Sequence, residues 1–207
     1  NVPGHYFTNG FDLTLRPERL EQPLRWRRPR RIFVNSMSDL FHPGVSDEFI
    51  VRVFAVMAQT PQHTYQLLTK RHGRMRSLLS HLNFRDRLTH VTTWPLPNLW
   101  LGVSAENQRW ADIRIPALLD TPAAVRWVSA EPLLDHLDLT RYLAGESGGL
   151  DWVVTGGESG PGARPADVAW FRSLQDQCAV AGVPFFFKQA GARLAQEGRC
   201  RDRQGGT

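Results

Sequence analysis

Side chains that could do acid–base chemistry recur in this sequence at one kind of place, directly after short apolar segments. Four of them are carboxylates and two are lysines: Asp39, Lys70, Glu106, Glu131, Glu158 and Lys188. Neighbouring carboxylates raise one another's pKa and lysines lower it, so groups with different pKa values can share one site. We interpret the six as candidate catalytic residues. The alternative interpretation is a ring of salt bridges that holds the fold together.

The apolar segments that precede these residues have the composition and spacing of buried parallel strands. They are rich in β-branched and aromatic residues and do not strictly alternate, which suits strands covered on both faces. Their starts lie 25 to 34 residues apart, and about 30 residues is the length of one βα unit. We predict strands at residues 32–34, 65–68, 99–103, 126–128, 151–154 and 185–187.

Helical patterns lie between the predicted strands. Ser46 can cap a helix whose apolar stripe reaches Met57. Further patterns predict helices over 71–82 and 107–119, the second with a kink or break at Pro116. A last helix is expected from Pro165 to about Ala181, closed by Gly182.

Alternating strands and helices allow a barrel or an open doubly wound sheet. In a barrel all carboxyl ends of the strands converge on one mouth, whereas an open sheet uses only the ends at its switch point. Because nearly every predicted strand is followed by polar residues, we predict an α/β fold with a parallel βα barrel, partial or TIM-like, of about six units. It forms one domain over residues 1–207, with a basic entry segment at residues 1–31.

A glycine-rich segment follows the fifth predicted strand. Residues 155–164 contain four glycines and lead into the last predicted helix. Glycines let a ligand approach the backbone closely, and a helix start attracts anions. The segment is therefore a candidate ligand-binding loop, with an ordinary tight turn as the alternative.

The chain is basic, with 25 lysines and arginines against 20 acidic residues. Five arginines cluster just before the first predicted strand, around Trp26: Arg25, Arg27, Arg28, Arg30 and Arg31. Such cations beside an aromatic ring could bind phosphates and stack on a base, so nucleic acid is a candidate partner. The alternative is a solvated loop.

Composition sets further limits. Of 207 residues 42% are hydrophobic, which is ordinary for a globular protein, and no apolar run is long enough to span a membrane. The two cysteines, Cys178 and Cys200, form no disulfide framework and fit a reducing cytoplasm. Since the chain starts at Asn1 and not at methionine, we expect a piece of a longer protein, trimmed at one or both ends.

Residues 33–42 (FVNSMSDLFH) resemble an uncharacterised bacteriophage and prophage family known for a three-cysteine motif. The resemblance starts near residue 9 and continues through LLTKR at 67–71, GVSAEN at 102–107, VSAEPLL at 128–134, GGESG at 156–160 and FFFKQ at 185–189. This family resembles radical S-adenosylmethionine enzymes. That resemblance implies a partial βα barrel, a cluster bound by three cysteines after the first strand, and adenosylmethionine on the fourth iron.

The resemblance implies adenosylmethionine and a four-iron–four-sulfur cluster in the full-length protein, with the cysteine motif just before Asn1 or lost by divergence. Neither Cys178 nor Cys200 can replace three closely spaced thiolates, so no cluster is expected in this chain. By position, Ser36, Ser38 and Asp39 would hold the methionyl end, and Ser104, Glu106 and Asn107 would meet the ribose. The implied cofactor-binding residues are Asn35, Ser36, Ser38, Ser104, Asn107, Gly156 and Gly157.

Two other function classes stay open. A hydrolase or lyase could use a divalent metal on a carboxylate–histidine set: Asp39, His42, Glu106, Glu131 and Glu158. The sequence has no His-Glu-x-x-His arrangement, so a zinc signature is missing and no metal ligand is assigned. A non-catalytic module could instead bind DNA through the arginine run.

Overall fold

The computed structural model describes residues 12–88, 91–143 and 148–196. Six strands form one sheet in chain order, and each neighbouring pair is parallel. They are β1 (Arg31–Val34), β2 (Thr64–Thr69), β3 (Leu99–Ser104), β4 (Val125–Ala130), β5 (Trp152–Gly156) and β6 (Phe185–Gln189). The predicted strands and their parallel arrangement are confirmed.

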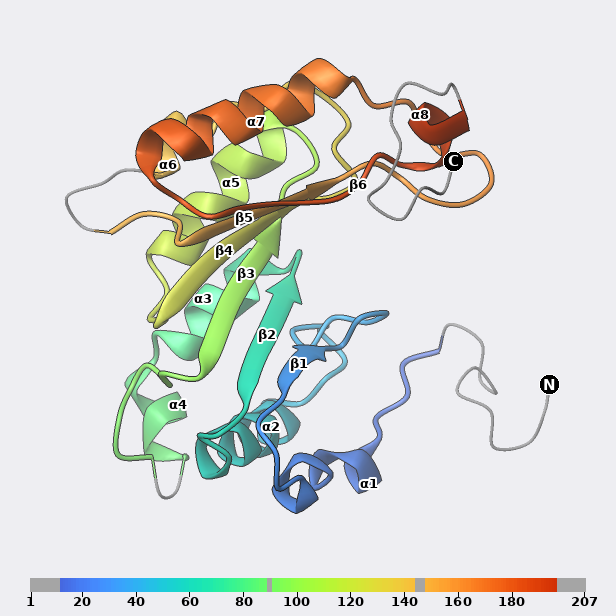
Figure 1. Cartoon of the computed structure of the whole chain (residues 1–207). Coiled ribbons are helices and arrows are strands. Elements are labelled where there is room, and N and C mark those ends of the chain that lie inside the picture. The colour runs from blue at the N-terminus through green and yellow to red at the C-terminus, as the bar shows by residue number, and fades with distance from the viewer. Residues whose placement is uncertain (1–11, 89–90, 144–147, 197–207) are drawn as a thin grey trace.

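The sheet is curled, and the strands follow one another around its curve (Figure 1). Within the described residues β1 and β6 lie at opposite ends of the strand order and do not pair. The molecule therefore contains an open half-barrel, in agreement with the partial parallel barrel predicted from the sequence.

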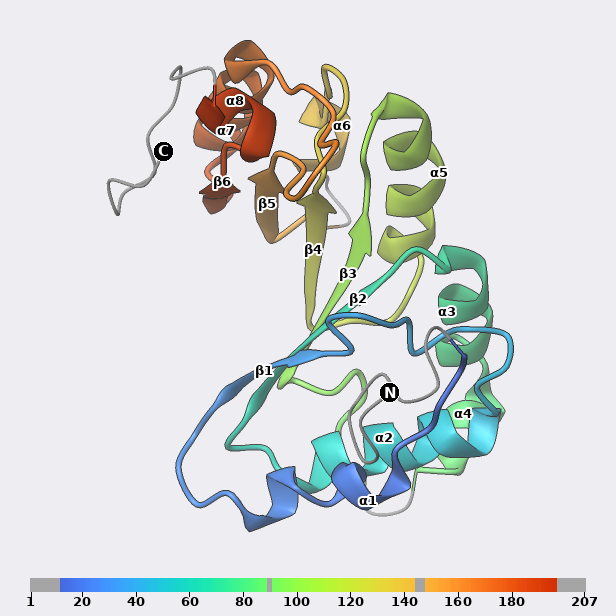
Figure 2. The same ribbon diagram turned by 90° about the vertical axis from the view of Figure 1, so that its right-hand side faces the viewer.

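Helices cover the outer face of this sheet (Figure 2). The described helices are α1 (Pro17–Leu20), the short 3₁₀ helix η1 (Pro23–Arg25), α2 (Asp47–Gln59), α3 (His72–Leu79), α4 (Leu82–Asp86), α5 (Gln108–Leu119), α6 (Thr140–Leu143), α7 (Val168–Ala181) and α8 (Ala192–Gln196). Among the helices of these described segments, none has the length and hydropathy to cross a bilayer.

Helix α2 forms as its sequence predicts. The Ser46 hydroxyl accepts a hydrogen bond from the backbone N–H of Phe49 at 3.2 Å, which satisfies a donor at the helix start. One face of the helix is buried against the sheet through Ile50, Phe54 and Met57. The helix is thus held by its cap and by the burial of its apolar stripe.

Three helix boundaries differ from the prediction. The segment 71–82 divides into α3 and α4, because the His81 ring accepts from the N–H of Asn83 and starts a new helix, leaving Leu82 75% exposed. Helix α5 continues through Pro116, so of the predicted kink or break the break is absent. Helix α7 begins after an Asp167 cap and not at Pro165, although Gly182 ends it in the left-handed conformation as predicted.

The two faces of the sheet carry different side chains. On the outer face, alternate strand residues such as Leu67, Leu101 and Val128 are buried under the helices. On the inner face, a Cβ atom at Gly102 would lie 2.4 Å from the Trp127 ring, so this ring lies across β3. It reaches the exposed Phe33 of β1, 6.2 Å away between ring centroids.

Candidate functional site

The carboxyl ends of the strands carry the six predicted catalytic residues, and most of these residues are paired with an opposite charge. We call this edge of the sheet the mouth. It holds the ion pairs Lys70–Glu106, Lys188–Glu131 and Arg164–Glu158, together with Asp39 on Thr69. The mouth thus presents alternating charges of both signs.

Glu106 is the most deeply placed of these carboxylates, with 8% of its surface exposed. Its Oε1 pairs with Lys70 and its Oε2 accepts from the Arg114 guanidinium at 2.9 Å. Burial alone would raise the pKa of Glu106, but the hydrogen bond from Lys70 and the charges of Lys70 and Arg114 lower it below its ordinary value. Glu106 is therefore a carboxylate anion and not a general acid at neutral pH.

Glu131 directly follows β4, and its side chain contacts residues of β6. Its Oε1 lies 3.0 Å from the Lys188 ammonium and 3.5 Å from the Gln189 amide nitrogen. The backbone of Gly156 passes so close that an added Cβ would lie 3.1 Å from Glu131 Oε1. The absence of a side chain at Gly156 therefore lets the Glu131 carboxylate lie close to the end of β5, and 19% of the Glu131 side chain stays exposed.

Glu158 and Arg164 are joined within the glycine-rich loop. The guanidinium donates to both carboxylate oxygens, at 2.6 and 2.9 Å, and the Arg164 N–H adds a third bond at 2.7 Å. The bonds from the Arg164 side chain and backbone lower the pKa of Glu158 to about 2. The bond to Glu158 in turn raises the pKa of Arg164, and the negative charge of Glu106 raises it further, which places Glu106 within electrostatic reach of this loop.

Asp39 lies in the loop after β1, and its carboxylate is held by the neighbouring strand. Thr69 donates to both oxygens, at 2.7 and 2.9 Å, and the Lys70 N–H donates at 3.1 Å. The residues before it, Asn35, Ser36 and Ser38, are exposed, and Asn35 has a positive φ of 59°. Asp39 thus fixes the loop to β2, while Ser36 and Ser38, the other two residues predicted to hold the methionyl end, are exposed.

The two glycines predicted to bind a cofactor serve different contacts. At Gly157 an added Cβ would lie 2.2 Å from the Ala190 carbonyl oxygen, so the close approach there is made by the backbone that follows β6. At Gly156 the nearest atoms belong to the Glu131 carboxylate. Of the pair, Gly156 is the one that lies beside a charged side chain of the mouth.

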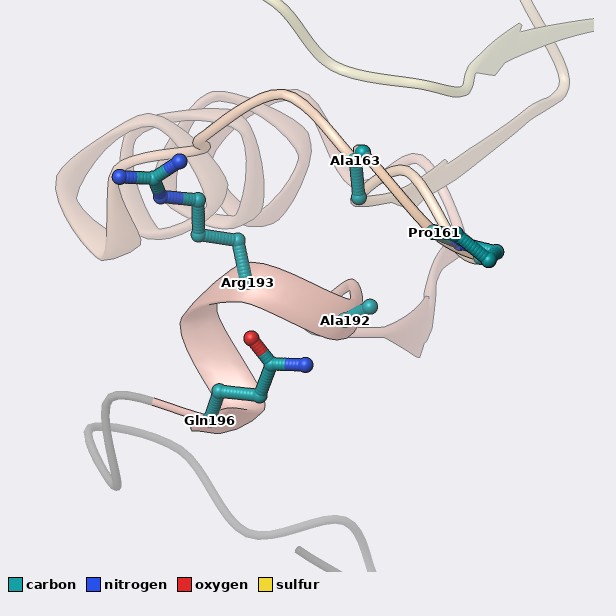
Figure 3. Close-up of a pocket in the computed structure, with 7 residues that line it drawn as sticks. Pro161, Ala163, Ala192, Arg193 and Gln196 are labelled. Atoms are coloured by element: carbon teal, nitrogen blue, oxygen red, sulfur yellow. The ribbon is translucent and has the colours of Figure 1, made fainter.

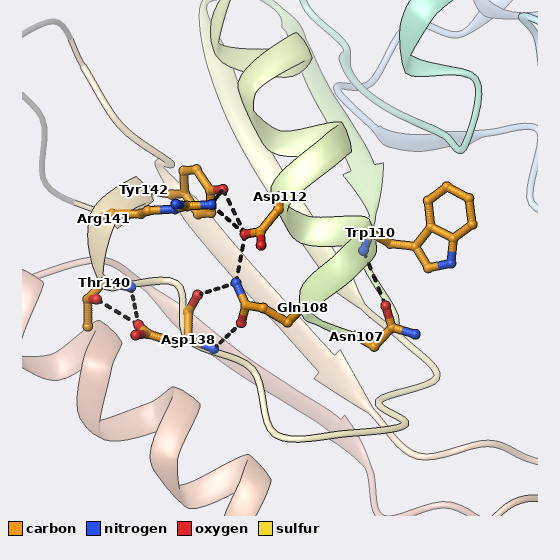
Figure 4. A network of polar contacts seen from close by, with 8 residues as sticks. All are labelled: Asn107, Gln108, Trp110, Asp112, Asp138, Thr140, Arg141 and Tyr142. Atoms are coloured by element: carbon orange, nitrogen blue, oxygen red, sulfur yellow. Dashed lines mark hydrogen bonds and ion pairs between the residues drawn. The ribbon is translucent and has the colours of Figure 1, made fainter.

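Ser104 and Asn107 lie beside Glu106. Ser104 is buried on the inner face and pairs with Ser129 in the strand register. Asn107 accepts a hydrogen bond from the N–H of Trp110 at 3.2 Å and so caps α5 (Figure 4). Its side-chain oxygen is therefore occupied by this helix-capping hydrogen bond.

Sequence reasoning missed the partners of these residues. Arg114 comes from α5 and Arg164 from the loop before α7, and neither follows a strand. Thr69 and Gln189 are the last residues of β2 and β6 and were passed over because they carry no charge. Arg114 had one usable signal: it follows Glu106 by eight residues, so a helix that starts at 108 brings it back over the strand end.

A second polar network lies outside the mouth, and its members form hydrogen bonds with one another. Asp112 of α5 accepts from Gln108, Arg141 and Tyr142, and Gln108 exchanges hydrogen bonds with the backbone of Asp138 (Figure 4). These bonds join α5 to the segment that enters α6. We assign the network to the fold and not to the site.

A hollow of about 350 Å³ lies between the glycine-rich loop and α8 (Figure 3). Pro161 and Ala163 line it from the loop, and Arg193 and Gln196 line it from the helix. The Ala192 N–H donates to the Glu158 carbonyl at 2.8 Å, which holds α8 to the loop. The hollow therefore adjoins the mouth without containing its carboxylates.

The predicted metal set does not converge. In the described segments no three histidine, cysteine or acidic side chains lie close enough together to hold one ion. The carboxylates contact cations instead, and His42 accepts from the N–H of Gly44 at 3.1 Å, as a loop residue does. Cys178 is buried on α7, and Cys200 lies outside the described residues.

Comparison with known proteins gives one family. No curated protein and no solved structure matches the chain. A family model described as "Protein of unknown function (DUF5131)" matches residues 4–206. This match covers nearly the whole length, including every strand and the complete mouth, and the chain belongs to the DUF5131 family.

Proposed function

We propose that the mouth binds S-adenosylmethionine and that the chain is the barrel of a radical adenosylmethionine-type enzyme from a bacteriophage or prophage family. The open half-barrel and its polar carboxyl edge support this proposal, together with the motifs at residues 33–42 and 102–107. We propose the partial and not the TIM-like form of the barrel, and a cytoplasmic location that agrees with the low cysteine content.

The charges of the mouth match those of this ligand. Adenosylmethionine carries a positive sulfonium, a positive amino group and a negative carboxylate. The carbon groups bonded to its sulfur are activated by the positive charge on that sulfur. Glu106 and Glu131 would attract the two positive centres, while Lys70 and Lys188 would attract the carboxylate. Because Glu106, Glu131, Lys70 and Lys188 already have partners of opposite charge, a zwitterion can bind without leaving an unpaired charge behind.

The observation that carries the proposal is the surroundings of Glu131. The Glu131 side chain is 19% exposed beside Gly156, and Lys188 lies 3.0 Å from its carboxylate. Phe186 of β6 pairs with Val154 in the strand register, which places it on the inner face, and it is 51% exposed. A carboxylate, an ammonium and an exposed ring on one inner face are the contacts that an amino acid joined to an adenine base requires.

An iron–sulfur cluster does not fit the residues of this chain. The sequence has two cysteines, fewer than the three thiolates that the resemblance implies. Burial raises the pKa of the Cys178 thiol to about 11, which makes the thiolate form that a cluster requires less accessible there. We therefore propose ligand binding for this chain and derive no step through a cluster.

Calorimetric titration of the chain with adenosylmethionine tests the proposal. We expect binding by the wild type and about tenfold or more weaker binding by Glu131→Gln, which keeps the shape but removes the charge that the sulfonium needs. Gly156→Ala should weaken binding as well, because its methyl group would cover Glu131 Oε1. Thermal melting checks that each variant is folded.

The matched control is Glu48→Gln on α2, an exposed carboxylate paired with Arg87 on the outer side of the molecule. It should bind adenosylmethionine like the wild type. No binding by the wild type, or equal affinity in wild type, Glu131→Gln and Gly156→Ala, contradicts the proposal.

A further inference from the structure

The excess positive charge of the protein lies in one segment. Residues 25–34 contain five arginines and no acidic residue. The chain has 25 lysines and arginines against 20 acidic residues, so without these five arginines its charges would balance. A partner attracted by the net charge of this protein is therefore attracted mainly to this segment.

The segment is held in place by a buried histidine. His63, 1% exposed, accepts from the Arg30 N–H at 3.2 Å through Nδ1, so its Nε2 carries the proton that it donates to the Pro23 carbonyl at 3.1 Å. The Trp26 ring packs edge-on against His63, and the Arg30 guanidinium lies 4.4 Å from the centre of the Trp26 ring. The arginines thus project from an ordered support.

Four of the five arginines have no acidic partner in the described part of the chain. Arg25 pairs with Glu21 at 3.7 Å, whereas no ion pair is formed there by Arg27, Arg28, Arg30 or Arg31. All four are exposed. Clustered exposed cations without counter-charges attract a polyanion, and guanidinium groups match phosphate geometry.

The basic segment continues onto the inner face of the sheet. Arg31 and Phe33 are exposed and alternate with the half-buried Ile32 and Val34 of β1, so both point to the inner face. Phe33 is 45% exposed, and its ring meets Trp127 edge-on. A flexible polyanion bound by the arginines would therefore find an aromatic ring beside it.

We propose that Arg27, Arg28, Arg30, Arg31 and Phe33 form a binding surface for single-stranded nucleic acid, with phosphates on the arginines and a base on Phe33. Stacking on Phe33 requires an unpaired base, which a duplex does not offer. The arginines precede or begin β1, at the amino ends of the strands, and Phe33 follows within β1. In the strand register Phe33 lies level with Gln66 of β2 and Trp100 of β3. Glu106 at the mouth is six residues further along the chain than Trp100, or about 20 Å away. The surface is thus a second site, independent of adenosylmethionine binding.

The test is fluorescence anisotropy of a labelled single-stranded oligothymidine, titrated with the chain at several salt concentrations. Four phosphate contacts predict a slope of log affinity against log salt of about −2.8. The double variant Arg27→Gln/Arg28→Gln should weaken binding and bring the slope to about −1.4. Phe33→Leu should weaken binding about fivefold or more with the slope unchanged, because it removes stacking and no charge.

The control is Arg52→Gln/Arg85→Gln, which removes two exposed arginines from α2 and α4 and should leave affinity nearly unchanged. Equal loss in the two double variants, an unchanged affinity in Phe33→Leu, or tighter binding of a duplex of the same sequence overturns the proposal. Calorimetry with adenosylmethionine keeps the two sites apart: both double variants should keep the affinity of the wild type for that ligand.

Discussion

At the scale of single residues, the mouth is built on a buried ion pair whose second partner comes from a helix. The Arg114 guanidinium donates to the Ser104 carbonyl and to Glu106, both at 2.9 Å, and it stacks 4.1 Å from the centre of the Trp110 ring. Both side chains of the pair are at most a tenth exposed. Removing one charge from such a pair leaves the other buried without compensation.

We predict that Glu106→Gln lowers the free energy of unfolding by about 3 kcal/mol, because Arg114 then stays buried without its anion. The amide conserves shape, so lost charge and not lost packing causes the effect. Urea denaturation at neutral pH measures it.

Glu48→Gln removes the anion of an exposed pair and should cost much less stability than Glu106→Gln, because solvent screens a surface ion pair. Equal losses of unfolding free energy in Glu106→Gln and Glu48→Gln would show that the Glu106–Arg114 pair stabilises the fold no more than a surface ion pair does. Because Glu106→Gln is expected to reduce stability, Glu131→Gln is the better variant for the binding experiment.

At the scale of elements, the inner face of the sheet depends on a glycine. Trp127 lies across β3 at Gly102, and its Nε1 donates to the Trp100 carbonyl at 3.2 Å. This arrangement lets a ring from β4 contact Phe33 on β1. The central strands therefore leave room for an aromatic layer that spans most of the sheet.

Gly102→Ala should destabilise the protein by about 1–3 kcal/mol, since its methyl group would lie 2.4 Å from the Trp127 ring and force it away. A change in tryptophan fluorescence of the folded state should accompany the loss. Denaturant unfolding followed by fluorescence gives both readouts.

Gly73→Ala is the matched control, because nothing lies within 4 Å of its added Cβ and the residue is in α3. That change should stabilise the protein by about 0.5–1 kcal/mol. If both alanine variants shifted stability in the same direction, steric contact with Trp127 would not be the cause at Gly102.

Element types and order could be predicted from the sequence because they depend on local patterns. The apolar runs marked the strands, and Ser46 and Gly182 marked two helix ends. The break between α3 and α4 could not be predicted, because it rests on His81 acting as a cap, a role that histidine seldom has. The path of α5 through Pro116 depends on packing that a local pattern does not record.

At the scale of the whole molecule, parallel strands brought the six predicted side chains to one edge, as their positions after the strands indicated. The sequence could not show how they pair, because Lys188 and Glu131 are 57 residues apart and their contact depends on the register of the sheet. For the same reason Gly157 was assigned to a ligand although it faces the backbone at Ala190. That these side chains meet at one edge follows from the topology of the sheet, whereas which of them pair depends on side-chain packing.

We predict that stability falls as the solution is acidified below about pH 4.5. Folding lowers the pKa of Glu106, so the unfolded chain binds more protons in acid and the stabilisation present above the ordinary pKa is lost as pH falls through the folded value. Glu158, with a pKa of about 2, acts in the same direction. Urea unfolding at pH 7 and pH 3.5 measures the loss, and Glu106→Gln should reduce it; an unchanged pH dependence in that variant would contradict the assignment.

In alkaline solution we predict that stability falls as pH rises, because the buried thiol of Cys178 titrates there. Burial raises its pKa to about 11, whereas an unfolded thiol ionises near about 8.5. The folded chain therefore holds its proton longer, and the stabilisation present below pH 8.5 is lost as pH rises, by about 2 kcal/mol at pH 10. Tyr65 and Tyr142, whose pKa values burial also raises, add to the loss as pH approaches 10.

Cys178→Ala separates the thiol from the tyrosines. The variant should be less stable than the wild type at pH 7, because Leu174 and Phe171 on the same buried face of α7 lose a packing neighbour. Between pH 7 and pH 10 it should lose about 2 kcal/mol less than the wild type, because its remaining alkaline loss comes from the tyrosines. Urea unfolding at both pH values under reducing conditions measures the difference, and parallel losses in the two proteins would show that the Cys178 thiol is not protected from ionisation by the fold.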